Sequence, residues 1–546
     1  MLYRFALGTL FVFMLFNGFR FLGASLLWND EAHTVMQGKL TMKYGYPRVE
    51  DERNLVYADN LEADANGEYA YLHPELKATT HSIWLGYYYA ALAVAVADGF
   101  SDIHTQTFVL RAFFLIMGLW GLYLFWCAFL RLLPDEQDQQ FFSIGYWLLM
   151  LLSVSLILHL REARYYALLV FELGLLTYAY TIWRLAFPDC HRMAFAGVAG
   201  ALAMVFYTFY PIFFIAFAAL GLIELILLVG SKHGLLHHVK AGLPVLASLV
   251  LVVPSWGFFN VFGSSGGELD WTENLALVGQ FFLKYEWLLA ALVAKGLLVF
   301  LLIRSRQMKQ PLLRADDPRV VGSLAVFLFF VVYFLVITRI PKPTFVFTRY
   351  YIFMIVLLAG SLMMDLTIIT SIWRKHKKEM NWLLPAAIGA CVLVSFVHIG
   401  KKTETWSGRL VELTTPYQGP LDYLVPYLIE TYQGNTENIV LATDYEETSF
   451  MYYLDCKVTI GFMGNRLEED LQYRPDVIVD RKYWRHLDQV IQPLVNQGQY
   501  QKITFPVQDF PMNNLPQLDG FMIPHQWRTL NTPMDGRMLE CFIRTQ

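Results

Sequence analysis

Charged residues are scarce in this chain of 546 residues, and their scarcity excludes an ordinary soluble protein. Asp, Glu, Lys and Arg make up 16% of the sequence, and hydrophobic residues make up 56%. Soluble domains usually contain about 25% charged residues. The formal net charge is only −4, so no excess of one sign indicates nucleic acid as a partner. The composition therefore predicts an integral membrane protein that does not bind nucleic acid.

Cysteine is also rare, with five residues and no CxxC pair. Their spacing argues against a zinc cage and against a redox dithiol. Cys456 and Cys541 lie in the polar C-terminal part of the chain, where they form either a disulfide or two free buried thiols. Internal repeats are absent as well, which argues against a transporter built from duplicated halves.

Apolar stretches of about 20 residues, the length that crosses a bilayer, occur along the first 400 residues. The first of them is expected to span rather than to be cleaved as a signal peptide, because it is long and lacks a good cleavage site. The twelve candidate segments are 5–27, 80–98, 108–131, 140–159, 165–184, 194–209, 212–230, 240–260, 285–303, 320–338, 350–369 and 382–399.

Lysine and arginine collect in four loops, at 184–192, 232–240, 304–319 and 374–378. Two apolar segments separate each of these loops from the next, so all four lie on one face, which the positive-inside rule makes cytoplasmic. Segment 80–98 starts with polar residues and is rich in tyrosine, so we expect a juxtamembrane helix there. Eleven spanning helices remain, and the polar loops between them then concentrate outside.

From Lys401 onward, short apolar stretches alternate with polar segments, a pattern typical of an α/β domain. We therefore predict a transmembrane domain over residues 1–400 and a soluble outer domain over 401–546, which is a usual domain size. The expected strands are 438–442, 457–462, 476–479, 503–507 and 538–543.

The first motif with chemical potential is Leu27–His33, at the outer end of the first apolar segment. It contains Asp30 and Glu31, and a carboxylate such as Asp30 is ionised at neutral pH and can accept a proton from an attacking hydroxyl. The alternative is structural: Asn29 or Asp30 caps a juxtamembrane helix that begins at Glu31.

The second motif, His159–Tyr166, contains Arg161, Glu162 and Arg164 in a short outer loop. Three charges so close to the bilayer are unfavourable unless they are paired or hydrated. One interpretation is a second acidic group beside cations that receive a phosphate. The other is an Arg–Glu–Arg cluster that reaches the headgroups, with the tyrosines as an aromatic belt.

The third motif places Arg339, Lys342 and Arg349 in the outer loop that ends at Tyr351. Cations are disfavoured in a translocated loop, so an anionic ligand at headgroup level is a natural reason for them. A structurally bound anionic lipid is the alternative.

The order of these parts resembles the GT-C glycosyltransferases, in the branch of protein O-mannosyltransferases and lipid A aminoarabinose transferases. Glu75 stands where the family has a second proline, and Glu162 stands where many relatives have Asp. The stretches that carry the resemblance are Leu27–His33, Tyr71–Leu76, Arg111, Arg161–Tyr166 and Thr348–Tyr351.

The resemblance implies transfer of a hexosyl or pentosyl group from a polyprenyl-phosphate donor to a hydroxyl of a glycolipid, polysaccharide or protein. It places the active site on the periplasmic side of a bacterial inner membrane, among membrane lipids. Asp30 and Glu162 are the catalytic candidates, and Glu31 and His73 would orient the acceptor or a divalent metal ion. The donor phosphate would contact Arg349, Lys342, Arg161, Arg164 and Tyr350. Independently of the resemblance, the composition and position of the loop Gly263–Asn274 predict a flexible lid over the donor.

Two other functions remain open. A transporter or flippase needs charged residues at mid-membrane depth, and the apolar runs contain Glu172, Glu224, Lys295 and Asp365. A non-catalytic assembly subunit of the cell envelope would bind through its outer domain and would not require Asp30.

Overall fold

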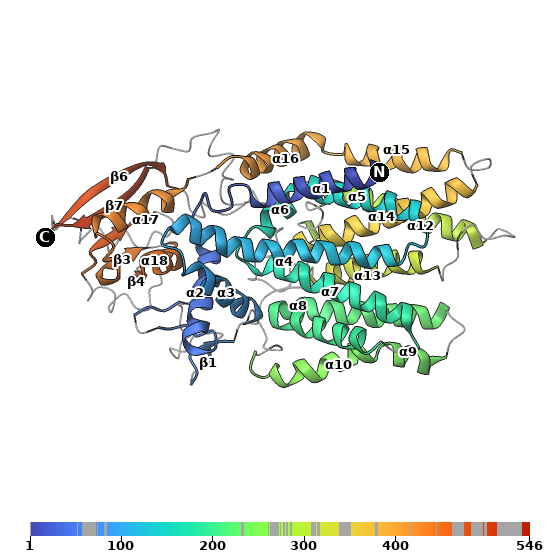
Figure 1. Cartoon of the computed structure of the whole chain (residues 1–546), viewed down its shortest axis with the longest axis horizontal. Coiled ribbons are helices and arrows are strands. Elements are labelled where there is room, and N and C mark those ends of the chain that lie inside the picture. The colour runs from blue at the N-terminus through green and yellow to red at the C-terminus, as the bar shows by residue number, and fades with distance from the viewer. Residues whose placement is uncertain are drawn as a thin grey trace.

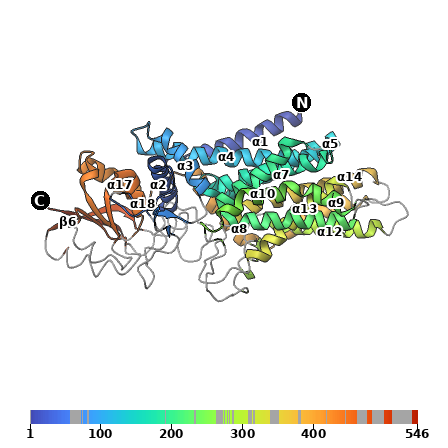
Figure 2. The same cartoon turned by 90° about the horizontal axis from the view of Figure 1, so that it is seen from below.

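The computed structural model is an elongated helical bundle with a small sheet domain at one end (Figures 1 and 2). We call this end of the bundle the sheet end and the opposite one the far end. Apart from a few isolated positions, the described residues are 2–51, 53–56, 72–73, 75–80, 84–189, 191–230, 234–259, 287–306, 317–337, 351–376, 381–416, 418–443, 445–460, 474–481, 499–509 and 538–545.

Apolar helices form the bundle, and they follow the predicted segments closely. Six of the described helices are long and apolar enough to cross a membrane, and two bent pairs, α5 with α6 (73°) and α9 with α10 (46°), raise the number to eight. The helices are α1 (Leu2–Phe19), α4 (Ile103–Arg131), α5 (Glu136–Leu152), α6 (Val154–Leu160), α7 (Tyr165–Ala186), α8 (Arg192–Gly230), α9 (Leu235–Ala241), α10 (Leu243–Val252) with the short helix η1 (Val253–Ser255), α12 (Leu288–Arg306), α13 (Pro318–Ile337), α14 (Ile352–Lys375) and α15 (Leu383–Ser395).

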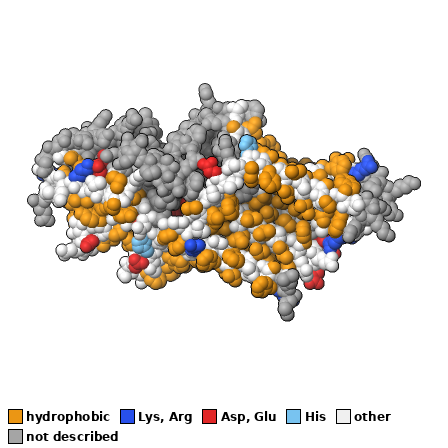
Figure 3. All heavy atoms as spheres, turned by 90° about the horizontal axis from the view of Figure 1, so that it is seen from above, with side chains coloured by type: hydrophobic (Ala, Val, Ile, Leu, Met, Phe, Trp, Pro, Cys, Tyr) orange, Lys and Arg blue, Asp and Glu red, His pale blue; other side chains and the backbone are white. Residues whose placement is uncertain are grey.

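Hydrophobic side chains cover the flank of the bundle (Figure 3), as expected for a protein surrounded by lipid. Val250, for example, is 76% exposed and Leu393 is 72% exposed. Such a continuous apolar surface is unusual on a soluble monomer. The prediction of an integral membrane protein is therefore confirmed.

Helix α8 folds back on itself, although its 39 residues form one continuous element. Its backbone leaves the helical region at Phe209 (φ −155°, ψ 87°). On one side of this break, the Phe195 ring lies 5.7 Å from that of Trp183; on the other, Glu224 lies 3.3 Å from Arg184. A straight helix would hold the two ends about 43 Å apart. The helix is therefore a hairpin of two limbs, as the two separate apolar segments predict.

The basic loops gather at the far end of the bundle. Asp138 pairs there with Arg319 at 3.5 Å and also with Arg374. These contacts join the first turn of α5 to the start of α13 and the end of α14 (Figure 1). The described parts of these loops therefore share one end, as the spacing of the apolar segments predicts.

The C-terminal domain contains a five-stranded sheet with the order β4-β3-β5-β7-β6. Strands β4, β3 and β5 are parallel, whereas β7 runs antiparallel to both β5 and β6. All five strands coincide with predicted ones. Their bounds are β3 (Val440–Thr443), β4 (Lys457–Ile460), β5 (Val477–Val479), β6 (Tyr500–Gln508) and β7 (Met538–Arg544), and the helices of this region are α16 (Ile399–Thr414), α17 (Pro420–Thr431), η3 (Thr436–Asn438) and α18 (Glu447–Leu454).

The cysteines of the C-terminal domain are free thiols. Of the two predicted alternatives, a disulfide or two buried thiols, the structure therefore shows the second. Cys456 and Cys541 are both buried. Burial raises the pKa of each thiol to about 12, which keeps both protonated and unreactive at neutral pH.

Two further helices, α2 (Asn29–Tyr44) and α3 (Trp84–Ala97), lie between the bundle and the sheet (Figure 1). A two-stranded sheet of β1 (Leu72–His73) and β2 (Ala78–Thr79) accompanies them. With 14 residues, α3 is about 21 Å long, and it packs mainly against α2. The close approach of α2 to α3 requires Gly38, because a Cβ there would lie 2.9 Å from the Ala90 backbone.

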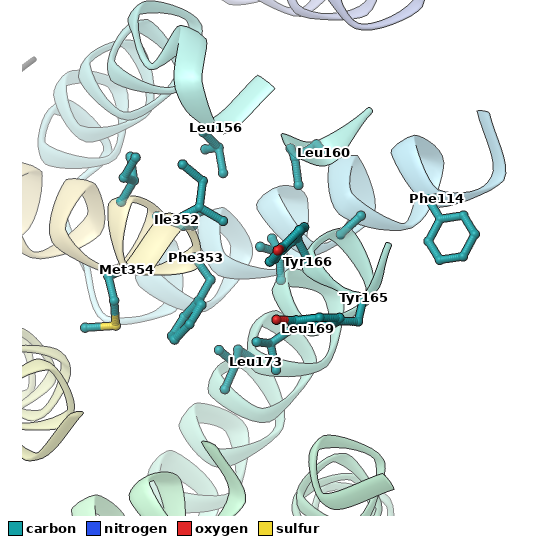
Figure 4. Close-up of a cluster of buried hydrophobic side chains, with 14 of the residues drawn as sticks. Phe114, Leu156, Leu160, Tyr165, Tyr166, Leu169, Leu173, Ile352, Phe353 and Met354 are labelled. Carbon is teal, nitrogen blue, oxygen red and sulfur yellow. The ribbon is translucent and has the colours of Figure 1, made fainter. Parts of the chain in front are cut away.

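A tightly packed core holds the loop between α6 and α7 in place (Figure 4). Leu156 and Leu160 of α6, Tyr166 of α7 and Ile352 of α14 belong to this buried cluster. Gly121 lets α4 and α7 touch, since a Cβ there would lie 2.6 Å from the Phe171 backbone. Small residues at such contacts are typical of membrane helices.

Candidate functional site

The acidic motif forms the first turn of α2, which begins at Asn29, two residues earlier than the capping alternative predicts. Asn29 and Asp30 therefore lie inside the helix. The capping role falls to Glu31, whose Oε2 accepts the Trp28 N–H at 3.4 Å. A Glu at the third helical position often reaches back in this way.

Glu31 is fully buried and forms a bidentate ion pair with Arg111 of α4. Arg111 donates from Nε to Oε1 at 2.9 Å and from Nη2 to Oε2 at 2.6 Å. Its Nη1 donates to the carbonyls of Leu22 and Ser25, in the turns that follow α1. A pair with this geometry satisfies the charges that burial would otherwise penalise. Glu31 therefore has a structural role, because its ion pair joins α2 to α4.

The loop after α6 lies directly on the acidic motif. The N–H of Ala163 donates to Glu31 Oε1 at 2.8 Å. Arg164 Nη2 lies 3.3 Å from Asp30 Oδ2, and its Nη1 donates to the Asp30 carbonyl at 3.1 Å and to Thr34 Oγ1 at 3.2 Å. Two motifs separated by about 130 residues thus meet at the sheet end.

Asp30 is the most accessible of the three acids in this region. Its side chain is 26% exposed, whereas that of Glu31 is 0% exposed and that of Glu162 is 3% exposed. Only an exposed carboxylate can exchange a proton with a molecule that approaches from solvent. Asp30 is therefore the acid that this geometry favours for chemistry.

Glu162 is buried against His159, a residue that the sequence analysis does not single out. His159 Nδ1 lies within hydrogen-bonding distance of Glu162 Oε1. The imidazole also meets the Tyr166 ring edge-on, at 5.3 Å between centroids. These contacts fix the Glu162 side chain inside the turn.

Arg161 points into the protein. Its Nη2 donates to the carbonyl of Arg20 at 2.6 Å, which ties the loop to the end of α1. Burial and the charge of Arg111 lower its pKa to about 10, while Glu412 and Glu31 act in the opposite direction. The guanidinium is therefore still cationic at neutral pH.

Other predicted site residues lie elsewhere or outside the described residues. The ring of His73 stacks on that of Phe258 at 5.4 Å, and its Nδ1 accepts the Leu76 N–H at 3.3 Å. His73 thus lies next to the turn that follows α10. Four predictions fall outside the described residues: Lys342, Arg349, Tyr350 and nearly all of the lid loop 263–274.

The predicted metal ion has no assembled site among the described residues. No group of three or more His, Cys, Asp and Glu side chains is arranged there to hold a metal ion. Glu31, one of the two residues proposed for this role, already accepts hydrogen bonds from Arg111 at both carboxylate oxygens.

The C-terminal domain binds the backbone just before Asp30. The N–H of Leu26 donates to Asp422 Oδ1 at 2.7 Å, and the N–H of Leu27 donates to the Tyr453 hydroxyl at 3.0 Å. Ser449 Oγ donates to the Leu27 carbonyl at 3.0 Å. Every one of these bonds connects residues about 400 positions apart in the sequence.

A second set of contacts brings α18 and the end of β3 to the first turn of α2. Thr448 Oγ1 donates to Asn29 Oδ1 at 2.6 Å. Tyr445 follows β3, and burial, together with the carboxylates of Glu446 and Asp30, raises the pKa of its hydroxyl. The carboxyl edge of the parallel strands, where ligands bind in many α/β sheets, therefore faces Asp30.

Sequence reasoning does not assign roles to Arg111, His159 or Thr448, although the first two leave a signal. An arginine inside an apolar run, such as Arg111, requires a partner, and Glu31 is an acid on the same face. His159 precedes Glu162 by three residues, the spacing of neighbours on a helix. Thr448 gives no such signal in the sequence.

Comparisons with known proteins do not extend this description. Neither a scan against protein-family models nor a search of curated proteins finds a match for this chain. The resemblance to the GT-C glycosyltransferases therefore remains a prediction, and the functional conclusion depends on the geometry around Asp30.

Proposed function

We propose that this chain is a membrane glycosyltransferase that moves a sugar from a polyprenyl-phosphate donor to an acceptor hydroxyl. The observation that carries the proposal is the contact between the first turn of α2 and the loop after α6. It places the accessible Asp30 carboxylate 3.3 Å from the Arg164 guanidinium, next to apolar helices. An acid beside a cation at this boundary suits a donor with a charged phosphate and a lipid tail.

The number of membrane spans supports the same proposal. We count each bent helix pair as one span, the α8 hairpin as two, and the shorter apolar helices α1 and α15 as one each. The sum is the predicted eleven, with α3 as the juxtamembrane helix. The basic far end then faces the cytoplasm, and Asp30 and the C-terminal domain lie outside, on the periplasmic side of a bacterial inner membrane.

Asp30 is the general base in the proposed reaction. It takes the proton of the acceptor hydroxyl while that oxygen forms a bond to the anomeric carbon. The bond from this carbon to the phosphate oxygen breaks, and the lipid phosphate leaves with the electron pair. Attack opposite the leaving group inverts the anomeric centre. Arg164 orients the Asp30 carboxylate during this step.

Lys342 and Arg349 are proposed to bind the donor phosphate. Both lie outside the described residues, and Tyr351 is the first described residue after them in the sequence. Ile352, the next residue, packs in the cluster with Leu156 and Tyr166 (Figure 4). Cations arriving here would stabilise charge on the leaving phosphate, each contributing about 3 kcal/mol.

Glu31 and Glu162 have positioning roles in this proposal, since both are buried and hydrogen-bonded. The C-terminal domain lies above Asp30 and would shape the acceptor site. A hydroxyl of a glycolipid, a polysaccharide or a protein is the corresponding acceptor.

A direct test is an assay of the purified protein with radiolabelled polyprenyl-phosphate sugars. The wild-type chain should release the carrier phosphate, and Asp30→Asn should abolish release while the protein remains folded, because the amide cannot accept the proton. Glu75→Gln is a matched control, as Glu75 is an exposed acid of the same outer segment. Normal turnover by Asp30→Asn would end the base assignment.

A transporter is the second candidate, and one observation favours it. Lys295 and Asp365 form a buried ion pair at 2.9 Å inside the bundle, and Lys295 also contacts Ser323. Paired charges at this depth mark ion pathways in many membrane proteins. Lipid or polysaccharide movement across vesicles without release of carrier phosphate would favour transport over transfer.

A further inference from the structure

A cavity of about 260 Å³ lies in the far half of the bundle, away from Asp30. Helices α4, α7, α8, α13 and α14 surround it. Most of the lining is apolar, with Leu176, Ala219, Ile223, Val321, Ala325 and Phe329 among the side chains. An apolar cavity of this size stays dry and accepts an apolar guest.

The cavity extends to the lipid-facing side of the far end. Leu185, on its rim, is 49% exposed. Pro318, the first residue of α13, and Leu227, near the end of α8, also line it. Hydrocarbon chains surround this part of the bundle, so one of them can enter from the side.

Arg184 adds a cation to this mostly apolar lining, which also contains Thr177, Tyr180 and Thr181. Its Nε lies 3.3 Å from Glu224 Oε1. Glu224 also accepts the Tyr180 hydroxyl at 2.7 Å and contacts His238 at 3.1 Å. Within the described residues, the two terminal nitrogens of Arg184 have no hydrogen-bond acceptor. Their planar array of N–H groups matches the oxygens of a phosphate.

Further cations lie near Arg184. Trp183 contacts Phe195 and donates to the carbonyl of Ala241 at 2.7 Å. These contacts bring the start of α8, which carries Arg192, and the end of α9, which carries Lys240, to the same place. Asp189 is the one acid in the turn from Arg184 to Arg192. The balance of charge at the mouth of the cavity is therefore positive.

We propose that this cavity binds a phospholipid with an anionic headgroup, with one acyl chain inside and the phosphate on Arg184. The apolar lining selects the chain, and the cations at the mouth favour a headgroup that carries net negative charge. This site lies at the opposite end of the bundle from Asp30, and the proposal does not depend on the glycosyltransferase assignment.

The test compares two lipids with identical acyl chains, phosphatidylglycerol and phosphatidylcholine, added to the purified full-length chain in detergent. A ligand that binds only the folded state raises Tm, so phosphatidylglycerol should raise it more than phosphatidylcholine. Arg184→Gln should weaken the apparent affinity for phosphatidylglycerol about tenfold, in line with the loss of a charge-assisted hydrogen bond. Arg4→Gln, which removes an exposed cation of α1 outside the cavity lining, should keep the preference.

A second variant tests the acyl chain. Ala325→Phe fills the cavity and should reduce the number of lipids retained in native mass spectrometry, whereas Ala386→Phe, on the exposed face of α15, should not. If Arg184→Gln does not fold, Arg184→Lys and Ala325→Phe still decide the matter. Equal Tm shifts for both lipids in the wild type, or an unchanged lipid count in Ala325→Phe, would overturn the proposal.

Discussion

Two neighbouring carboxylates of the acidic motif differ sharply in what their surroundings allow. The Glu31 carboxylate accepts hydrogen bonds from Arg111, Ala163 and Trp28. It therefore cannot also bind a substrate. Asp30 is one residue away, faces Arg164 and is partly exposed. The division between a structural and an available acid follows from their positions on the first turn of α2.

The sequence predicts that Asp30 and the loop after α6 act together, but it does not show which acid is exposed. That distinction depends on Arg111, which approaches from a different helix. Long-range partners of this kind have no local pattern. For the same reason, the buried contact of His159 with Glu162 emerges only once α6 is packed.

Asp422 makes the stability of the protein depend on pH. Burial raises its pKa to about 7, although the N–H groups of Leu26 and Gly419 act in the opposite direction. The unfolded value is about 4, so between pH 4 and 7 the folded state holds a proton that the unfolded state releases. The contribution of Asp422 to the free energy of unfolding is therefore fully present below pH 4 and is lost as pH rises through 7.

Thermal unfolding between pH 5 and 8 checks this dependence. The difference in Tm between the wild type and Asp422→Asn should fall as pH rises towards 7 and should be constant above about pH 8, because the asparagine does not titrate. A difference that is independent of pH would show that Asp422 has an ordinary pKa in the folded protein.

At the scale of elements, the sequence predicts the apolar helices and all five strands, because each has a clear period or length. It does not predict the bend between α5 and α6, which reads as one segment. The backbone turns at Ser153, whose hydroxyl accepts the Trp287 indole N–H at 3.1 Å. Because a contact with a residue far away in the sequence accompanies this bend, the local sequence pattern does not predict the bend.

The contact between α18 and the start of α2 leads to an experiment on hydrogen exchange. Tyr453→Phe removes the acceptor of the Leu27 N–H. The amide of Leu27 should then exchange several-fold faster, since a net hydrogen bond contributes about 1 kcal/mol.

The neighbouring tyrosine supplies a matched control for this experiment. The Tyr452 hydroxyl is buried and has no hydrogen-bond partner within the described residues, so Tyr452→Phe should leave exchange at Leu27 unchanged. Equal protection in the Tyr453→Phe variant and the wild type would refute the idea that α18 holds this segment.

For the whole molecule, composition alone predicts a membrane bundle followed by an α/β domain, and the structure agrees. The predicted boundary at residue 400 falls in the first turn of α16, and this helix packs against α6. Trp406 of α16 donates to the carbonyl of Leu152, the last residue of α5, at 3.0 Å. The docking of the sheet domain on α2 is not foreseeable, because its contacts join residues about 400 positions apart.

The orientation of the molecule can be tested by labelling single cysteines in intact cells. A thiol reagent that does not cross membranes should modify Glu75→Cys, at the sheet end, and should not modify Arg192→Cys, at the far end. Both positions are exposed, and the wild-type chain gives the background of its native cysteines. Labelling of Arg192→Cys alone would show that the orientation is the reverse of the proposed one, with Asp30 in the cytosol.

The bonds from Asp422, Ser449 and Tyr453 to Leu26 and Leu27 also set an order of events during biosynthesis. The ribosome makes Asp30 more than 390 positions before the residues that hold its turn. The N-terminal helix can thus enter the membrane long before its outer turn acquires its final shape. A chain that stops before Asp422 would keep Asp30 but lack these contacts, so maturation of this turn waits for synthesis of the C-terminal domain.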